Sequence, residues 1–409
     1  MTTAAIETPE LGFRPSVSQY EQFRDALQGY ALPAAIISLE AFDANVQAVL
    51  RHTGDKPVRI GTKSVRCTAL LRRIQQTSPR FQGLLCFHAR EAAWLAHQGF
   101  DDLLVAYPTV NPPTVAEVCR AIAKGRRITL MVDCIEHVQR LDVLAGAAGV
   151  RLPLCLDIDM SLPLPGLWFG ARRSPIRSAD EAVEVWQAIR SRRHVFLDGV
   201  MGYEAQIAGL PDADPRQRLR SSVIRRLKRI SQRDVLRRRG DIVEALRAAG
   251  AELRFVNGGG SGSLASTAAD PSITEVSAGS AFFAPASFDH HSDFDFLPAA
   301  GFALEVARIP APGMVTCNGG GYPASGVPGE DRLPLPWLPE GLAYVSTEAA
   351  GEVQTPLINA TGLAIGDPVL FRHAKAGELC ERFNELLLIA DGRVLAAVPT
   401  YRGEGQTFL

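Results

Sequence analysis

Val58-Arg59-Ile60-Gly61-Thr62-Lys63-Ser64 is a short apolar run that ends in a lysine, and its pattern is repeated along most of the chain. Similar apolar runs recur, and most are followed by a stretch in which apolar residues have helical spacing. Alternating strand and helix patterns favour a parallel sheet, and eight such units favour a (β/α)₈ barrel. We therefore predict an α/β fold built on a TIM barrel.

The apolar runs that predict strands begin near residue 34 and continue to residue 257. They are residues 34–39, 58–60, 83–87, 102–107, 128–132, 152–158, 199–202 and 253–257. A further strand-like run, residues 273–276, follows the series. The glycine in Lys124-Gly125 suits the end of one intervening helix, because glycine adopts left-handed backbone angles readily.

A glycine-rich loop, Gly258-Gly259-Gly260-Ser261-Gly262-Ser263, follows the strand-like run that ends at Asn257. Glycines let the backbone approach a ligand closely, and their N–H groups can converge on phosphate oxygens. A string of Gly and Ser can also be a flexible linker, but a linker here would interrupt the repeats. Late strands of such barrels often carry phosphate sites, and Ser277-Ala278-Gly279-Ser280 could complete the cup.

The presence of this loop makes Lys63 a candidate functional residue. A single lysine after a strand is usually a solvated surface residue. A strand-end amine together with a strand-end phosphate cradle is, however, what a barrel enzyme needs to hold pyridoxal phosphate.

The overall composition describes a globular protein. The chain has 409 residues, is 46% hydrophobic and 21% charged, and carries a formal net charge of −1. We expect no nucleic-acid or membrane partner, since no global charge would attract either and no run of eighteen apolar residues occurs. Seven scattered cysteines without a Cys-x-x-Cys pair argue against a disulfide framework or a zinc knuckle. With no signal peptide apparent at residues 1–19, these features predict a cytoplasmic protein.

One segment departs from the charge balance. Residues 216–239 contain eleven Lys or Arg residues and a single acid, Asp234. Leu219, Val223, Leu227 and Ile230 share one helical face, which predicts an outer barrel helix with a solvated basic side. A nucleic-acid-binding arm is the alternative, although no aromatic residues interleave the charges.

The pattern changes near Phe288. Residues 289–295 resemble a linker, and short β-rich runs follow at 343–346, 368–371, 386–389 and 394–398. Asp391-Gly392 lies between the last two runs and predicts a hairpin turn. We therefore predict a barrel over residues 31–295 and a smaller C-terminal β domain over residues 296–409. An N-terminal arm, residues 1–30, is expected to join the β domain.

Six segments in order resemble the fold-type III pyridoxal-phosphate enzymes, specifically the D-threonine aldolase and D-serine dehydratase-like group related to alanine racemase. The resemblance covers nearly the whole chain. The segments are residues 39–45, Gly61-Thr62-Lys63-Ser64, residues 99–108, Met201-Gly202-Tyr203-Glu204, the loop at 258–263, and Glu275-Val276-Ser277-Ala278-Gly279-Ser280.

The resemblance implies that Lys63 forms the Schiff base with the cofactor. Tyr203 is similar to the family's tyrosine beside the pyridine ring, although a half-buried core tyrosine is an equal alternative. The residues expected to hold the phosphate are Gly259, Gly260, Ser261, Gly262 and Ser280. A homodimer is also implied, with an amino acid as its small-molecule substrate.

The expected chemistry follows from the cofactor, which acts as an electron sink while the protein selects the bond that breaks. The leading expectation is a lyase that cleaves a D-3-hydroxy amino acid to glycine and an aldehyde. The alternatives are a D-serine or 3-hydroxyaspartate dehydratase, α-proton chemistry such as racemisation, and a non-catalytic cofactor carrier. Arg59 and Arg66 lie close in sequence to Lys63, and neighbouring cations favour its uncharged amine.

Two departures from the family remain open. The resemblance puts Cys380 on the Cys or Asp position of the family's site for a divalent metal such as zinc, manganese or magnesium, with Glu378 in place of the histidine. Alternatively, His373 reaches in from a local insertion, with Cys380 or Glu378 beside it. The alternative is a lost site in which Cys380 is a small core residue. Trp168 stands where the family commonly has an arginine; Arg172 or Arg173 could instead meet a substrate carboxylate, or lie on the surface.

Overall fold

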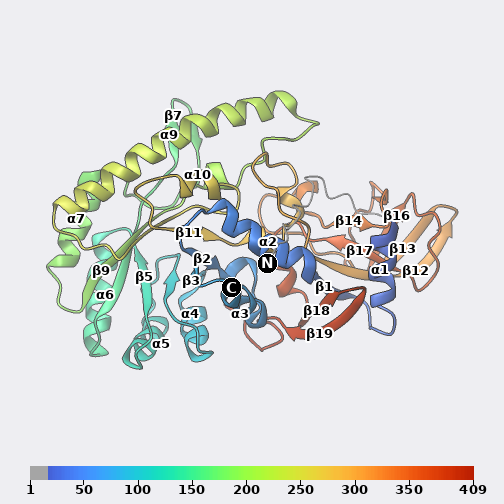
Figure 1. Ribbon diagram of the computed structural model, residues 1–409, viewed down its shortest axis with the longest axis horizontal. Helices are drawn as coiled ribbons and strands as arrows, with labels where there is room; N and C mark the ends of the chain where they lie inside the picture. Colours follow the sequence, from blue (N-terminus) through green and yellow to red (C-terminus); the bar gives the residue numbers. More distant parts are fainter. Residues whose placement is uncertain (1–16) are drawn as a thin grey trace, which may run out of the picture.

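The structure is a computed structural model that describes residues 17–409. Residues 1–16, which form the first part of the predicted N-terminal arm, lie outside the described residues. Figure 1 shows two lobes, a barrel with helices around it and a strand-rich lobe that contains most of the chain after residue 300.

Eight parallel strands close into a barrel, which confirms the predicted TIM barrel. In barrel order the strands are β2 (Val58–Gly61), β3 (Phe81–Cys86), β4 (Leu103–Val105), β5 (Ile128–Val132), β6 (Leu152–Asp157), β9 (Val195–Gly202), β10 (Phe255–Gly258) and β11 (Glu275–Ala278). The larger helices between them are α3 (Thr68–Thr77), α4 (Ala89–His97), α5 (Pro112–Ala123), α6 (Ile135–Ala147), α7 (Ala179–Arg190) and α9 (Arg218–Ala248). Because the strands are parallel, their carboxyl ends all open at one mouth.

The first predicted strand is real but belongs to the other sheet. β1 (Ala34–Ser38) pairs antiparallel with β12 (Ala300–Ala311) and parallel with β18 (Glu385–Ala390). Its side chains are buried on both faces, with Ile36 in the core of the second lobe and Ile37 in the main core. The run at 273–276 supplies part of the eighth barrel strand instead, so the predicted barrel range of 31–295 includes one strand of the second sheet.

The second sheet has nine strands and lies mostly after residue 300, which confirms a smaller β-rich C-terminal domain beside the barrel. Its remaining strands are β13 (Met314–Asn318), β14 (Leu335–Leu338), β15 (Ala343–Tyr344), β16 (Gln354–Ile358), β17 (Pro368–Arg372) and β19 (Arg393–Pro399). β18 and β19 form the predicted hairpin, and Asp391 and Gly392 at its turn have φ of 50° and 68°. Helix α1 (Val17–Ala26) packs on this lobe, with the ring of Phe23 5.7 Å from that of Trp337.

Helix α9 is the predicted outer helix, but it buries a different face from the one we predicted. Leu219, Val223 and Ile230 are 87%, 58% and 43% exposed. The helix instead packs through other residues, among them Ile224, Lys228, Ser231 and Val235. In Figure 1 the 31-residue helix runs along the upper edge of the barrel and continues toward the second lobe. Part of its length therefore has no barrel strand beneath it, and a helical pattern alone cannot show where that support ends.

Helix α2 (Leu39–His52) connects β1 of the second sheet to β2 of the barrel. The remaining elements are short: the hairpin β7 (Leu162–Leu164) and β8 (Leu167–Phe169), α8 (Ala205–Ala208), α10 (Leu264–Ala268), and the 3₁₀ turns η1 (Thr62–Ser64), η2 (Ser280–Phe282), η3 (Ala286–Phe288), η4 (Glu330–Arg332) and η5 (Glu378–Glu381). No helix within residues 17–409 combines the length and apolar character needed to cross a bilayer.

Candidate active site

A cavity of about 160 Å³ lies at the mouth of the barrel. Its walls come from the carboxyl ends of strands and the loops that follow them, as expected for this architecture. Six of the seven residues predicted to act on or hold the cofactor line it: Lys63, Tyr203, Gly259, Gly260, Ser261 and Ser280. The seventh, Gly262, lies in the same loop but outside the lining. Residues separated by more than two hundred positions thus meet in one cavity.

Lys63 stands in η1, directly after β2, at the junction of the two lobes. Its side chain is exposed toward the cavity, and its carbonyl oxygen accepts a hydrogen bond of 3.0 Å from Arg66 Nε. Gly377 of the second lobe, with φ of 83°, packs so closely that a Cβ there would lie 1.8 Å from the Lys63 carbonyl oxygen. The second lobe therefore fixes the backbone that carries the lysine.

Arg59 and Arg66 do not act as free cations beside Lys63. Arg59 is fully buried and donates to Glu275 Oε1 at 2.7 Å and to Asp102 Oδ2 at 3.1 Å. Arg66 is paired with Glu381. Because carboxylates already engage both guanidinium groups, the expected help to the lysine from these two neighbours is not supported by the geometry.

The glycine-rich loop has the shape of a phosphate cradle. A Cβ on Gly262 would lie 2.3 Å from the carbonyl oxygen of Ala208, and one on Gly260 would lie 3.0 Å from Tyr203 Cε2. Ser261 Oγ accepts hydrogen bonds from the backbone N–H of Gly279 (3.3 Å) and of Ala281 (2.9 Å), which ties this loop to the turn after β11. Small residues, hydroxyls and backbone amides at this spot fit a phosphate group.

A buried ion-pair network contacts the backbone of this loop. The sequence analysis did not predict it. Glu204 Oε2 accepts from the backbone N–H of Gly259 and from Arg239 Nη1, each at 3.2 Å. Arg239 also donates twice to Asp270 Oδ2, at 2.8 and 3.0 Å. Arg239 is one of the eleven basic residues of the charged segment, and only its 2% exposure distinguishes it from its solvated neighbours.

Arg173 supplies the second cation of the cavity. Among the described residues that line it, Lys63 and Arg173 are the only ones with a cationic side chain. Arg173 Nη2 donates to the carbonyl oxygen of Ala106 at 3.1 Å and lies 3.7 Å from Asp157 Oδ2, and its guanidinium faces the Tyr107 ring. The pKa of Asp157 is raised to about 7, because the effect of burial exceeds the opposing effect of the Arg173 guanidinium.

Trp168, at the position of the family's expected arginine, does not line the cavity. Its ring instead lies under the guanidinium groups of Arg172 and Arg177, at 4.6 and 4.5 Å. Of the two arginines left open by the sequence, Arg172 is therefore packed on Trp168, and Arg173 reaches the cavity.

Tyr203 lies against Gly260 at the cavity wall, and burial raises the pKa of its hydroxyl to about 12. The phenol is therefore neutral near pH 7, so it can donate a hydrogen bond but does not act as a base there. The ring is half-buried and also faces the cavity.

The three predicted metal ligands do not form one site. His373 is buried with its ring edge-on to Phe283, and burial lowers the pKa of its imidazole to about 3. Glu378 accepts from the Ser325 backbone N–H and hydroxyl, while the Cys380 thiol points to the carbonyl oxygen of Val65 at 3.3 Å. His373 and Glu378 line a second cavity of about 520 Å³ without Cys380. Within residues 17–409 these three do not make a group of three converging ligand atoms. The pairings of Glu378 with Cys380, or of His373 with either of them, stay predictions.

Comparison with known families places this site in context. The model of the family described as "Alanine racemase, N-terminal domain" matches residues 37–286. A 3-hydroxy-D-aspartate aldolase from Paracoccus denitrificans (strain Pd 1222) is 23% identical over 266 residues, which are 64% of this chain and 62% of the relative. The matched region thus spans less than two thirds of that relative's length.

Solved structures extend the likeness to both lobes. A D-threonine aldolase from Filomicrobium marinum has a TM-score of 0.77 and 20% identity, with 91% of this chain and 96% of that chain covered. A D-threo-3-hydroxyaspartate dehydratase from Delftia sp. HT23 has a TM-score of 0.70 and 18% identity, with coverage of 92% and 99%. At these identities the likeness establishes a shared two-lobed fold.

Proposed function

The chain belongs to the alanine racemase N-terminal domain family, and we propose that it is a pyridoxal-phosphate-dependent lyase acting on a D-3-hydroxy amino acid. The observation that carries this proposal is the single cavity that joins the Lys63 amine to the glycine and serine cradle. An amine and a phosphate cradle separated by one small cavity are the two attachment points that this cofactor requires.

Each lining residue then has a specific task. The cofactor, when bound, withdraws electrons from the substrate carbon next to the amino group. Lys63 Nζ would hold the cofactor covalently, and its amine could hold a proton at the barrel mouth. Ser261, Gly260 and Ser280 hold the phosphate. Tyr203 donates a hydrogen bond from a hydroxyl that stays protonated near pH 7.

Arg173 is proposed to bind the substrate carboxylate. It is the remaining cation in the cavity, and a guanidinium can grip a carboxylate with two parallel hydrogen bonds. Asp157, partly protonated near pH 7 because of its raised pKa, leaves the charge of Arg173 incompletely neutralised.

The reaction we favour is retro-aldol cleavage to glycine and an aldehyde, with dehydration as the second candidate. An aldolase and a dehydratase, each named for a hydroxylated D-amino acid, are among the similar proteins. Since His373, Glu378 and Cys380 do not converge, we assign no step to a metal held by these three residues.

The proposal is tested with purified protein loaded with pyridoxal phosphate. We expect Lys63→Ala to lose the visible absorbance of the Schiff base and at least about 10³-fold of lyase activity. Lys124→Ala, which changes an exposed lysine at the end of α5, is the control and should keep both. Borohydride reduction should fix the cofactor to the peptide that contains Lys63; label on another lysine would overturn the assignment.

Product analysis separates the two reactions. D-threonine and D-3-hydroxyaspartate should each yield glycine and an aldehyde in equal amounts. Ammonia and a 2-oxo acid without glycine would show a dehydratase, and neither product pair would remove the lyase proposal. Light scattering tests the homodimer, and the cytoplasmic location remains a prediction from the cysteine pattern.

A further inference from the structure

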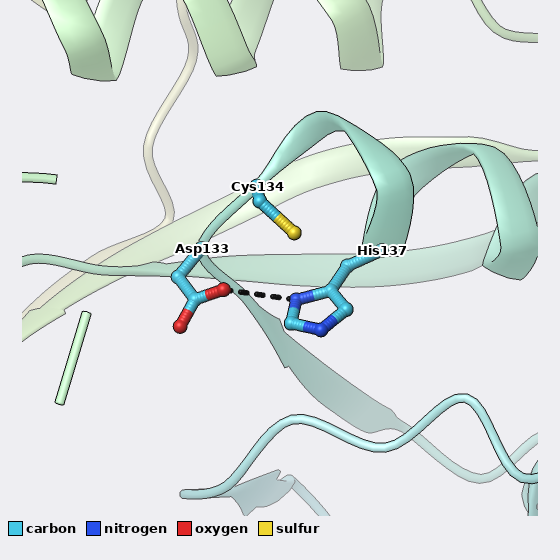
Figure 2. Close-up of side chains that lie close together, drawn as sticks. All are labelled: Asp133, Cys134 and His137. Atoms are coloured by element: carbon cyan, nitrogen blue, oxygen red, sulfur yellow. Dashed lines mark ion pairs between the residues drawn. The ribbon is translucent and has the colours of Figure 1, made fainter. Parts of the chain in front are cut away.

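A second group of metal-ligating side chains lies at the carboxyl end of β5, outside the residues that line the Lys63 cavity. Asp133, Cys134 and His137 each offer one ligand atom, and these atoms lie within 4.8 Å of one another. Figure 2 shows the carboxylate and imidazole facing each other, with the thiol of Cys134 beside them. Among residues 17–409 this is the only group of three such ligands.

The spacing of the group is close to that of a tetrahedral zinc site. Asp133 Oδ1 lies 3.0 Å from His137 Nδ1. Two ligands at about 2.0–2.1 Å from a tetrahedral Zn²⁺ are roughly 3.3 Å apart, so both atoms could bind one ion with little movement. Carboxylate, thiolate and imidazole form a mixed ligand set that suits zinc better than magnesium or calcium.

The three residues are arranged so that an ion can reach them. They belong to one short segment, the end of β5 and the first turn of α6, so no distant loop has to close. The side chains of Asp133 and His137 are 15% and 25% exposed. Cys134 is the only one of the seven cysteines that is not buried. Three protein ligands and access to solvent leave a fourth position for water.

The surrounding charges accommodate a cation. The register that pairs Val132 with Leu156 places Asp133 beside Asp157 of the neighbouring strand, and Asp133 helps to raise the pKa of Asp157. Within the described chain the only ion pair of Asp133 is with His137, so no lysine or arginine occupies the position. The carboxylate and a thiolate together supply two negative charges, which offset the ion and the positive N-terminal end of α6.

We propose that Asp133, Cys134 and His137 bind one zinc ion with a water as the fourth ligand. The site lies outside the lining of the Lys63 cavity, so zinc binding does not depend on the proposed reaction.

Cobalt(II) spectroscopy on the full chain tests the site, because cobalt replaces zinc and a thiolate ligand gives a charge-transfer band in the near ultraviolet. Spectra are recorded as the difference between cobalt-loaded and metal-free protein, which cancels the absorbance of the cofactor. We expect the band in the natural sequence and in Cys380→Ser, and its loss in Cys134→Ser.

Metal counting complements the spectrum. Elemental analysis after dialysis against zinc should show one equivalent fewer in Cys134→Ser and in His137→Ala than in the natural protein. Circular dichroism of each variant checks that it is folded. The proposal is overturned if the natural protein gives no thiolate band, or if folded Cys134→Ser keeps both the band and the zinc content.

Discussion

The loop at 258–263 was expected to bind the cofactor phosphate, and the segment at 373–380 was expected to bind a divalent metal. The two segments have very different surroundings in the structure. The loop lines the Lys63 cavity and is held by Glu204 and, through it, by Arg239. The segment points its three predicted ligands in different directions, toward Phe283, Ser325 and Val65. The loop therefore contributes to a cavity, whereas the three side chains of the segment do not converge.

The difference lies in what surrounds each segment. The loop follows a parallel barrel strand, and closure of the barrel brings every strand's carboxyl end to one mouth. The segment follows β17, a strand of the mixed second sheet, and passes through a left-handed turn at Gly377 before the short turn η5. Topology forces convergence in the first case, whereas local backbone angles decide direction in the second.

The largest effect is expected from removing Arg239, which pairs with the Glu204 carboxylate that holds the loop at 258–263. Arg239→Met leaves Glu204 and Asp270 buried without their cation, and breaking a buried pair in this way costs about 3–5 kcal/mol. We expect a lower thermal midpoint and weakened binding of pyridoxal phosphate, measured by thermal denaturation and absorbance titration.

The control for Arg239 is Arg237→Met on the same helix. Arg237 is exposed, and its pairs with Asp234 and Asp241 contribute about 0–1 kcal/mol. Equal effects of the two substitutions would show that the buried network does not support the loop.

A smaller effect is expected from the loop itself. Gly262→Ala places a Cβ against the carbonyl oxygen of Ala208, so the loop must shift and cofactor affinity should fall about tenfold, or about 1.4 kcal/mol. Gly240→Ala is the matched change, because a Cβ there has no atom within 4 Å. It lies within α9 and should stabilise the helix by about 0.5–1 kcal/mol. Unchanged affinity in folded Gly262→Ala would show that this loop does not hold the cofactor phosphate.

Another expected effect, of similar size per pH unit, concerns acid stability at the other segment. Burial lowers the pKa of His373 to about 3, so between roughly pH 6.5 and 3 the unfolded chain binds a proton that the folded chain does not. The free energy of unfolding therefore falls as pH falls through this window, by at most about 1.4 kcal/mol per pH unit from this residue. His373→Leu should flatten the dependence, measured by urea midpoints at several pH values.

His97→Leu, at an exposed position at the end of α4, is the comparison for His373 and should leave the pH dependence unchanged. A dependence that changes when zinc is added to the natural protein, and no longer changes in His373→Leu, would show that His373 binds metal after all.

The barrel was predictable because its signal is repeated. Seven of the eight runs first counted as barrel strands are barrel strands, and only residues 34–39 moved to the other sheet. Strand content is a local property, set by apolar β-prone residues, while sheet membership depends on partners such as β12 and β18, which lie hundreds of residues away.

The sequence predicted the position of the lysine and the glycine loop, but not the buried residues that contact them. Lys63 and the glycine loop stand at strand ends, so their meeting follows from the fold. The sequence could not choose between Arg172 and Arg173, and Arg239 resembles its basic neighbours in the sequence; only burial and partners distinguish them. The misassigned face of α9 has the same origin, since periodicity shows an apolar stripe and does not show what covers it.

What the sequence determined by itself is the order of strands and helices, the closed parallel barrel they imply, and the amine and cradle at its mouth. These follow from periodicity and from glycine's backbone freedom, which act over a few residues. Only the tertiary structure decided which arginine faces the cavity, which carboxylates are buried beside it, and which predicted ligands never meet. Those outcomes depend on side-chain direction and burial, which arise when distant segments pack together.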